Sequence, residues 1–387
     1  MSAFLLHCLI AFFAALVFAL VLGSWKEVFE AARSEGPTSA KVLPPRQVSL
    51  IVPARDAAGT LVPLLQDLHA QRYPKDLLEV LVVDDHSSDG TAMTVRGMMR
   101  AWPQLRLITS TGEGKKAAIA QGVAEARGEW MVLTDADARC SPLRVAHIMH
   151  KVQVAGPDML ILPVETIGES GFIQRVQADE QTALLGVAAG TALGGAPVLV
   201  NGANMAFSKA AFMAVGGYEG DHWASGDDIF LMRRMLKARR NVRYLLDPEV
   251  VVSVKAEPMF GAFWRQRLRW AGKMRGVGGA GGWAALAGML LPWFLLYVSC
   301  SFNLNEMMVQ RPIACVLLLA SAWMLWLLPV LALTRAVRRF LHTADDHRPV
   351  RGADFSTFVS LVAFTVYAPI IAVVSLFIRP KWKGRRT

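Results

Sequence analysis

Four stretches of the chain lack Lys, Arg, Asp and Glu and are each about as long as a bilayer is thick. They are residues 3–22, 276–305, 312–334 and 355–378. Because a helix needs about 20 apolar residues to cross the hydrocarbon core, each stretch is a candidate transmembrane helix. The chain is also 53% hydrophobic, more than an ordinary soluble enzyme. We therefore expect an integral membrane protein.

A charged region separates the first candidate span from the other three and is long enough for one globular domain. We expect a transmembrane helix at 3–22, a globular domain at 47–257, an interfacial helix at 258–276 and three C-terminal segments within 280–378. The first span could instead be a cleaved signal peptide. It lacks a basic start and no clear A-x-A site follows it, which favours a retained anchor.

The charges around the first span indicate its orientation. Four basic residues follow it: Lys26, Arg33, Lys41 and Arg46. Because positive charge favours the cytoplasmic side, we expect the chain to start outside and the globular domain to be cytoplasmic, at an inner or plasma membrane. Four spans would then put the basic tail after Ile378 outside, against the same rule. A re-entrant segment would remove this conflict, and Pro292 makes 276–305 a candidate.

Net charge and cysteine usage narrow the class of partner. The net charge is +10, from 41 basic and 31 acidic residues. In a membrane protein this charge fits anionic headgroups, and no nucleic-acid motif accompanies it. The four cysteines form no C-x-x-C pair, so we expect neither a disulfide framework nor a zinc site. His147 and His150 fit a surface helix better than a metal site.

Short apolar runs alternate with helical segments after a polar stalk at 24–45. We expect strands at 48–52, 79–83, 105–108 and 129–133, and helices at 61–70, from 88–91 onward and at 114–126. Ser88 and Asp89 are suited to cap the second helix. Strands that alternate with helices predict an α/β fold with a parallel sheet.

Polar residues follow three of these strands. They are Arg55 and Asp56 after the first, Asp84 and Asp85 after the second, and Asp135 and Asp137 after the fourth. Ligands of parallel sheets bind beyond the carboxyl ends of the strands. Two carboxylates one residue apart can also hold a divalent cation that binds phosphate oxygens. The pattern favours a shared site for a diphosphate, although turn chemistry alone also explains single aspartates.

Five motifs in order resemble the membrane-integrated members of glycosyltransferase family 2, which have the GT-A (Rossmann-like) nucleotide-sugar-binding fold. They are VPARD at 52–56, VVDDHSSDGT at 82–91, TDAD at 134–137, GDDIFL at 226–231 and QRLRW at 266–270. The third is a D-x-D motif, the fourth is similar to E-D-x-x-L, and the fifth matches Q-x-x-R-W. The resemblance spans roughly residues 49–270.

The resemblance implies a donor site with a divalent metal, Mg²⁺ or Mn²⁺. Asp137 would hold the metal, with Asp135 near the ribose or the metal. Pro53 would line the base, and Asp56 and Asp85 would lie near the base and ribose. The ion would stabilise negative charge on the leaving diphosphate.

The fourth motif implies a general base. Asp228 takes the place of the family's second acid and would accept the proton of the acceptor hydroxyl. Asp227 replaces the usual Glu, and its role stays open. Both acids could instead cap the helix that follows, since acids favour the positive end of the helix dipole.

Several further residues are candidates for diphosphate and acceptor contacts. Lys115 and Lys116 could touch the diphosphate or be solvated. Asn201 and Asn204 could bind a hydroxylated acceptor, and a structural role fits them equally.

The fifth motif predicts contacts from one helix face. Gln266, Arg269 and Trp270 share a face that could close over the diphosphate and the acceptor. Residues 182–200 are apolar, but their glycines and Pro197 favour buried packing near the acceptor entrance over a fifth span.

Together these features predict an inverting, metal-dependent glycosyltransferase. It would move a sugar from a nucleotide-sugar, which we expect to be UDP-linked, to a lipid or lipid-linked acceptor at the membrane. A processive polysaccharide synthase is an alternative, although three C-terminal spans are few for a wide channel. A catalytically silent nucleotide-binding scaffold for cell-envelope assembly is an alternative of another class.

Overall fold

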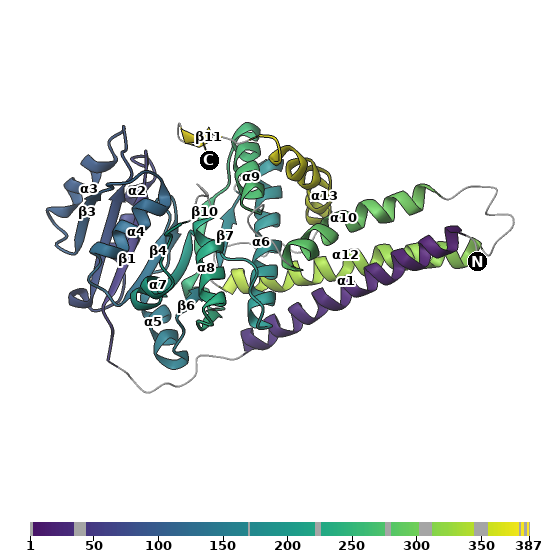
Figure 1. Cartoon of the computed structure of the whole chain (residues 1–387), viewed down its shortest axis with the longest axis horizontal. Helices are drawn as coiled ribbons and strands as arrows, with labels where there is room; N and C mark the ends of the chain where they lie inside the picture. The colour runs from purple at the N-terminus through teal and green to yellow at the C-terminus, as the bar shows by residue number, and fades with distance from the viewer. Residues whose placement is uncertain are drawn as a thin grey trace.

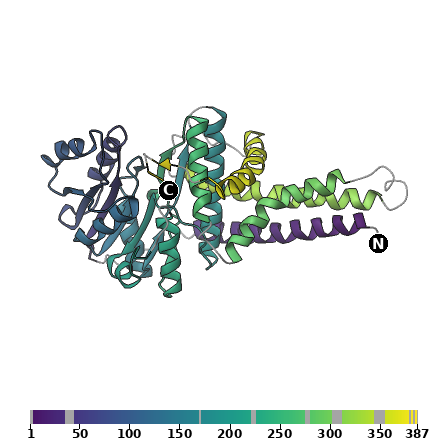
Figure 2. The ribbon, with the colours of Figure 1, turned by 45° about the horizontal axis from the view of Figure 1, so that its top comes forward.

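The computed structural model describes residues 3–34, 44–168, 171–220, 226–274, 280–301, 312–343, 355–378, 381–382 and 385–386. A globular α/β domain forms one part of the molecule, and long helices extend from one side of it (Figure 1). The N-terminus lies at the far end of these helices, and the C-terminus lies beside the globular domain in both views (Figure 2). The two termini are therefore at different ends of the helical part.

A seven-stranded sheet in the order β3-β2-β1-β4-β8-β6-β9 forms the centre of the globular domain. Its strands are β1 Val48–Ala54, β2 Leu78–Asp84, β3 Leu105–Thr109, β4 Trp130–Thr134, β6 Met159–Ile161, β8 Asn204–Ser208 and β9 Val242–Tyr244. The first four are parallel, and β8 is antiparallel to both of its neighbours. Smaller sheets contain β5 Arg139–Cys140, β10 Val252–Lys255 and β7 Val164–Ile167, and β11 Lys381–Trp382 with β12 Arg385–Arg386. The predicted α/β class and all four predicted strands are confirmed.

Helices cover both faces of this sheet because its strands alternate their apolar side chains between two cores. Leu50 and Val52 belong to one core with α2 and α5, whereas Ile51 belongs to the other core with α4. The helices of the domain are α2 Leu61–His69, α3 Thr91–Met99, α4 Lys115–Glu125, α5 Arg144–Ala155, α7 Lys209–Ala214 and α8 Asp227–Lys237. Two short 3₁₀ helices, η1 Lys75–Leu77 and η2 Pro248–Val250, complete it.

The start of α3 differs in detail from the prediction. The N-cap residue is Gly90, which has no side chain to cap the helix. Asp89 still accepts a hydrogen bond from the Thr91 N–H at 2.9 Å. Ser88 turns to the other loop instead: its hydroxyl donates to Asp56 Oδ1 at 3.1 Å, and its N–H donates to the same oxygen at 2.7 Å. This contact joins the loops that follow β1 and β2.

Six longer helices make up the rest of the described chain. They are α1 Ala3–Ser34, α6 Phe172–Leu193, α9 Phe260–Met274, α10 Ala280–Cys300, α12 Pro312–Thr343 and α13 Phe355–Ser375. α1 and α12 lie side by side, and α10 runs along α12 (Figure 1, Figure 2). α6 and α9 run across that direction, between the sheet and the long helices, and α13 packs on both.

Three of the described helices are long and apolar enough to cross a membrane: Phe4–Ser34, Ile313–Thr343 and Ser356–Ser375. The predicted segment 276–305 lies partly outside the described residues, and Met289–Cys300 forms a shorter apolar helix there. α6, which contains part of 182–200, is not among the three candidates and packs against α1, α12 and α13.

The predicted polar stalk is wrong as far as Ser34, because α1 continues past residue 22. Tertiary contacts explain the extension. Phe29 is fully buried and meets the Phe340 ring edge-on at 6.0 Å, and Glu30 pairs with Arg339 at 2.8 Å. Both partners belong to α12, so packing on that helix extends α1 toward the globular domain.

Candidate active site

Ten of the predicted site residues line one cavity of about 1900 Å³. They are Pro53, Asp56, Asp85, Lys116, Asp135, Asp137, Asp228, Gln266, Arg269 and Trp270. The cavity opens at the carboxyl ends of β1, β2 and β4. Since β1 lies between β2 and β4, the three loops that carry these aspartates are neighbours. Residues up to 217 positions apart in sequence are thus brought to one place.

The loops after β1 and β2 are held together by Arg55 and two aspartates. Arg55 Nη1 donates to the Asp85 carbonyl at 3.0 Å and lies 3.9 Å from Asp85 Oδ2. Asp85 is almost fully buried and accepts from the Gly114 N–H at 3.0 Å. Gly114 has φ 91°, a conformation that favours glycine. Asp56 accepts a hydrogen bond from the Ser88 N–H, and this bond holds the pKa of Asp56 below the ordinary value of an aspartate.

Asp84 fixes the loop after β2. Its Oδ1 accepts from the Ser87 N–H at 3.3 Å and also from the Ser87 hydroxyl. Asp84 is not among the cavity-lining residues. The adjacent acids Asp84 and Asp85 therefore have different surroundings, one in the loop and one at the cavity.

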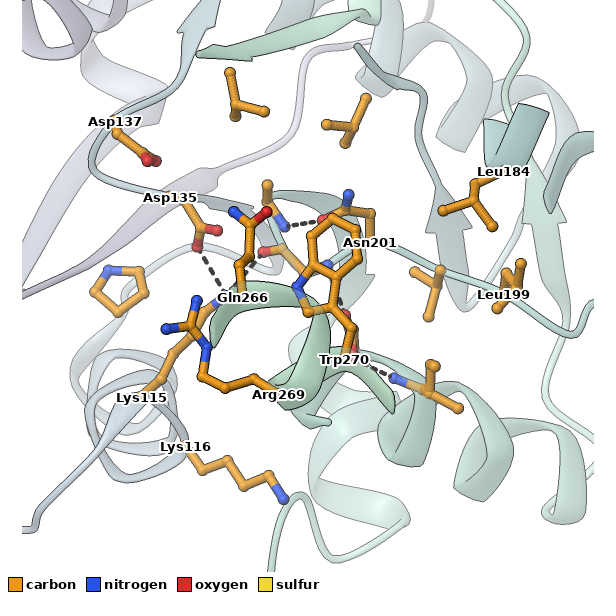
Figure 3. Close-up of a pocket in the computed structure, with 18 of the residues that line it drawn as sticks. Lys115, Lys116, Asp135, Asp137, Leu184, Leu199, Asn201, Gln266, Arg269 and Trp270 are labelled. Atoms are coloured by element: carbon orange, nitrogen blue, oxygen red, sulfur yellow. Dashed lines mark hydrogen bonds and ion pairs between the residues drawn. The ribbon is translucent and has the colours of Figure 1, made fainter. Parts of the chain in front are cut away.

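Lys115 pairs with Asp135 at 2.7 Å, at the junction of α4 and the loop after β4 (Figure 3). Its ammonium also lies 3.5 Å from the Gly202 carbonyl. The ammonium of Lys116 lies over the Phe230 ring, 5.2 Å from its centroid. Both lysines line the cavity, and Lys115 is in contact with the D-x-D segment.

Asp135 and Asp137 both line the cavity and offer the carboxylate oxygens that Mg²⁺ and Mn²⁺ accept. Within the described part of the chain, no three His, Cys, Asp or Glu residues form a cluster that could hold a metal ion by themselves. Two carboxylates fit an ion that takes its other ligands from a diphosphate and water.

Asp228 lies in the first turn of α8 and is 5% exposed. Its Oδ2 accepts from the Gly202 N–H at 3.0 Å, and its Oδ1 accepts from the Ile229 N–H at 2.8 Å. The carboxylate therefore bonds to a helical N–H, as a capping acid does, and also lines the cavity. The side chain of Asp227 lies outside the described part of the structure.

Asn201 and Asn204 have different surroundings. Asn201 lines the cavity, and its Oδ1 accepts from the Ala203 N–H at 3.0 Å. Asn204 has no exposed surface, and its Nδ2 donates to the Pro163 and Val250 carbonyls at 2.7 and 2.8 Å. The structural alternative therefore fits Asn204, and Asn201 alone of the two faces the cavity.

Arg144 supports the site from behind and was missed by the sequence analysis. It is fully buried and donates to Thr134 Oγ1 at 2.7 Å, the Leu133 carbonyl at 3.0 Å and Asn204 Oδ1 at 2.8 Å. Burial lowers the pKa of this guanidinium. Because Thr134 precedes Asp135, Arg144 ties the end of β4 to β8. Its three partners come from two other strands, so no local pattern could have indicated the contact.

Gln266, Arg269 and Trp270 project from α9 into the cavity, as their spacing predicted (Figure 3). Arg269 is much desolvated there, and this burial lowers the pKa of its guanidinium. In Figure 3 these side chains lie between Asp135 on one side and Leu184 on the other.

Arg267, inside the same motif, forms a buried cluster that the sequence did not reveal. Its guanidinium lies over the rings of Phe263 and Trp270, 4.9 and 4.2 Å from their centroids. Its Nε and Nη2 lie 2.7 and 2.6 Å from Glu180 Oε2, which also accepts from the Tyr367 hydroxyl at 2.8 Å. This Glu180–Arg267–Tyr367 cluster joins α6, α9 and α13 and lines the cavity.

Comparison with known proteins identifies the domain around the D-x-D segment. The sequence model of glycosyl transferase family 2 matches residues 49–215. The chain contains a family 2 glycosyltransferase domain. Its globular part has the GT-A fold, as the sequence motifs predicted.

Three curated relatives and one solved structure resemble this chain. "Probable glycosyltransferase YdaM" of Bacillus subtilis is 25% identical over 58% of the chain and 54% of that protein. Beta-monoglucosyldiacylglycerol synthase of a Synechocystis species is 27% identical over 60% of the chain and 48% of that protein. The chain thus spans about half the length of these relatives.

The solved structure is a mannosyltransferase from Pyrobaculum calidifontis in complex with GDP-mannose and Mn²⁺. It is 19% identical, and the superposition covers 92% of the chain and 99% of that protein with a TM-score of 0.54. This likeness concerns the fold. A poly-beta-1,6-N-acetyl-D-glucosamine synthase of Staphylococcus epidermidis is also similar, 22% identical over 58% of the chain and 53% of that protein.

Proposed function

We propose that the chain is a membrane glycosyltransferase that moves a sugar from a UDP-linked donor to the hydroxyl group of a lipid or lipid-linked acceptor, with inversion. One observation carries this proposal. A single cavity brings together the D-x-D acids, Asp228 and the Q-x-x-R-W face, and its walls include the membrane helix α13. A sugar donor and a membrane acceptor can therefore meet there.

We assign the donor to the end of the cavity formed by the loops after β1, β2 and β4. Pro53, Asp56 and Asp85 would contact the nucleoside there. Asp135 and Asp137 would hold Mg²⁺ or Mn²⁺, which when bound would neutralise charge on the diphosphate.

The cations of the chain would assist departure of the diphosphate. Lys115, Lys116 and Arg269 line the same cavity as the D-x-D acids. As the bond between the sugar and the diphosphate breaks, its electron pair moves to a phosphate oxygen. Fixed positive charges beside that oxygen would stabilise the transition state more than the ground state.

Asp228 is the proposed general base. The hydroxyl oxygen of the acceptor attacks the anomeric carbon as its proton passes to Asp228, and the bond to the diphosphate breaks on the opposite face. A single displacement of this kind inverts the anomeric configuration. The N–H groups of Gly202 and Ile229 hold the carboxylate in position, which supports a base of fixed geometry.

We place the catalytic domain, residues 47–257, in the cytoplasm, with the interfacial segment 258–276 and the helices within 280–378 at an inner or plasma membrane. Charge distribution supports this side. A processive polysaccharide synthase is the second candidate, because one relative carries that activity in its name. Product length separates the two.

The test is sugar transfer by the purified full chain in detergent. Labelled UDP-sugars or GDP-mannose would be offered with total membrane lipid and Mn²⁺ or Mg²⁺. We expect a labelled lipid whose formation falls about 10²–10⁴-fold in Asp228→Asn, while UDP binding persists. Asp76→Asn, in the distant η1, is the matched control and should keep full activity.

Three other results would count against the proposal. A labelled polymer would support the synthase. Nucleotide binding without a product from any donor would support a silent scaffold. Full activity in Asp228→Asn would remove the assigned base.

A further inference from the structure

The cavity has two ends of different chemistry. Near Asp135 and Lys115 it is lined by charged groups, whereas beyond Trp270 it reaches Leu184 and Leu199 (Figure 3). The two ends belong to one continuous space. A ligand that fills both must therefore have a polar part and a hydrocarbon part.

The apolar end is enclosed by three helices. We call it the apolar arm, and its walls are Leu184 and Ala188 of α6, Met289 of α10, and Phe364, Ala368 and Ile371 of α13. From Phe364 to Ile371 the arm follows α13 for about 10 Å, at 1.5 Å per residue. α13 is one of the candidate membrane helices. With α13 in a bilayer, the arm would lie at the depth where hydrocarbon chains of lipids are found.

The two sides of α13 differ in exposure. Ile371 faces the arm and is 4% exposed, whereas Ile370 and Val373 are about half exposed on the other side. One helix thus separates the arm from the lipid phase, and a chain entering the arm exchanges one apolar environment for another. Water-soluble acceptors would gain nothing from these walls.

The Glu180–Arg267–Tyr367 cluster marks the border between the arm and the polar end. All three residues line the cavity, and their charges are already paired with each other. Asp228 adds a second carboxylate on the polar side. A phosphate placed here would gain no free cation from the cluster, because Arg267 is paired with Glu180, and it would meet the carboxylate of Asp228. A neutral headgroup that donates hydrogen bonds meets no such repulsion.

We propose that the apolar arm binds the hydrocarbon chain of a neutral lipid alcohol whose hydroxyl group reaches Asp228. This inference rests on the proposed function, since it names the acceptor of the same reaction. The hydrocarbon chain passes from the lipid phase into the arm without losing apolar surroundings, whereas an acceptor without such a chain finds no comparable place there. The Glu180–Arg267–Tyr367 cluster sets how far the headgroup can enter.

Photo-crosslinking tests the arm without requiring catalysis. The full chain would be placed in phosphatidylcholine vesicles with a diacylglycerol that carries a diazirine in one acyl chain. We expect labelled peptides from α6 and from the inward side of α13, and at least a fivefold loss of label with excess unlabelled diacylglycerol. A diazirine phosphatidylcholine should label the outward side at Ile370 and Val373, without that competition.

Two filling variants and one control make the test specific. Ala368→Trp and Leu184→Trp fill the arm from different helices. Each should lower at least fivefold the labelling that excess unlabelled diacylglycerol can compete away. Ile370→Trp adds the same bulk on the lipid side and should change it less than twofold. UDP affinity should stay unchanged in all three variants, which checks that the donor end is intact.

The outcomes separate the arm from the enzymatic activity. Competed labelling with no sugar transfer to any lipid would uphold the arm and reject the proposed function. Sugar transfer to lipid, with labelling that unlabelled diacylglycerol does not reduce, would reject the arm. A loss of labelling in Ile370→Trp equal to that in the two filling variants would also reject it. Competition by a polyprenyl phosphate but not by diacylglycerol would overturn the neutral-alcohol assignment.

Discussion

Lys115 and Asp135 form an ion pair where the donor diphosphate is expected to bind. Their 2.7 Å contact places a cation beside the D-x-D acids before any ligand arrives. We expect Lys115→Met to weaken binding of UDP about tenfold in the presence of Mn²⁺, because the fixed charge beside the diphosphate is lost. Isothermal titration would measure the affinity.

The matched control for Lys115→Met is Lys237→Met, at the exposed end of α8. This variant also removes one positive charge, but at a position away from the cavity. Its UDP affinity should therefore stay within twofold of the wild type. Equal affinities in Lys115→Met and the wild type would show that Lys115 serves only Asp135 and does not reach the diphosphate.

His147 gives the domain a pH-dependent contact. Its Nδ1 lies 2.7 Å from Asp247 Oδ2, and this hydrogen bond raises the pKa of His147. The folded state therefore holds the proton more tightly than the unfolded state. The resulting stability is full below the unfolded pKa of about 6.5 and is lost as pH rises through the raised folded value.

The corresponding variant is His147→Gln, which keeps a hydrogen-bonding side chain without a charge. Because both side chains are partly exposed, we expect it to cost about 0.5–1 kcal/mol at pH 5.5 and progressively less at higher pH. Thermal unfolding of the full chain in detergent across this pH range would measure the difference. A difference that grows with pH would contradict the assignment.

At the scale of elements, a buried ion pair joins α6, α9 and α13. Arg267 and Glu180 are both less than a tenth exposed, and Tyr367 supplies a further hydrogen bond. Removing one partner leaves a buried charge uncompensated, so we expect Glu180→Gln to destabilise the chain by about 3 kcal/mol. Tyr367→Phe should cost about 1 kcal/mol.

Glu30→Gln provides the comparison for this pair. Glu30 also bridges two helices, α1 and α12, but its partner Arg339 is half exposed. Its loss should cost less than about 1 kcal/mol. Thermal unfolding in detergent would rank the three variants. Equal midpoints for Glu180→Gln and Glu30→Gln would show that the buried pair adds no special stability.

The sequence predicted those elements whose patterns are local. The strand at Val48–Ala54 and the apolar face of α2 follow directly from periodicity, and the aspartates at the strand ends follow from the rule for parallel sheets. Arg144 and Arg267 were not found, because their partners lie in other elements. For the same reason α1 was cut short, since its last turns pack on Phe340 of α12.

At the scale of the molecule, the cavity lies where the globular domain meets the long helices. Its polar end is built by loops of the sheet, and its apolar arm is built by α6 together with α10 and α13, which the sequence assigned to the membrane. Neither part alone would enclose both substrates of the proposed reaction. This arrangement explains why a donor site of soluble type is joined to a hydrophobic bundle.

The positions of the termini address the conflict over the basic tail. α1 starts at the far end of the helices and reaches the globular domain, and the C-terminus lies beside that domain (Figure 1). α10 runs away from the domain and α12 returns to it. Were α1, α10 and α12 each to cross a membrane, three crossings would bring the chain back to the side of the domain, and α13 would both begin and end there.

We thus predict that α13 enters the membrane without crossing it, so the re-entrant segment is α13 and not 276–305. Alkaline phosphatase, active only outside the cytoplasm, should be active when fused before Ala3 or after Ser301 and inactive when fused after Thr343 or after Ile378. Green fluorescent protein, which fluoresces only in the cytoplasm, should give the opposite pattern when fused at the same positions. The fusions after Thr343 and Ile378 decide the matter, because they bracket α13. Opposite behaviour of these two would make α13 a true span and would return the basic tail to the outside, against its charge.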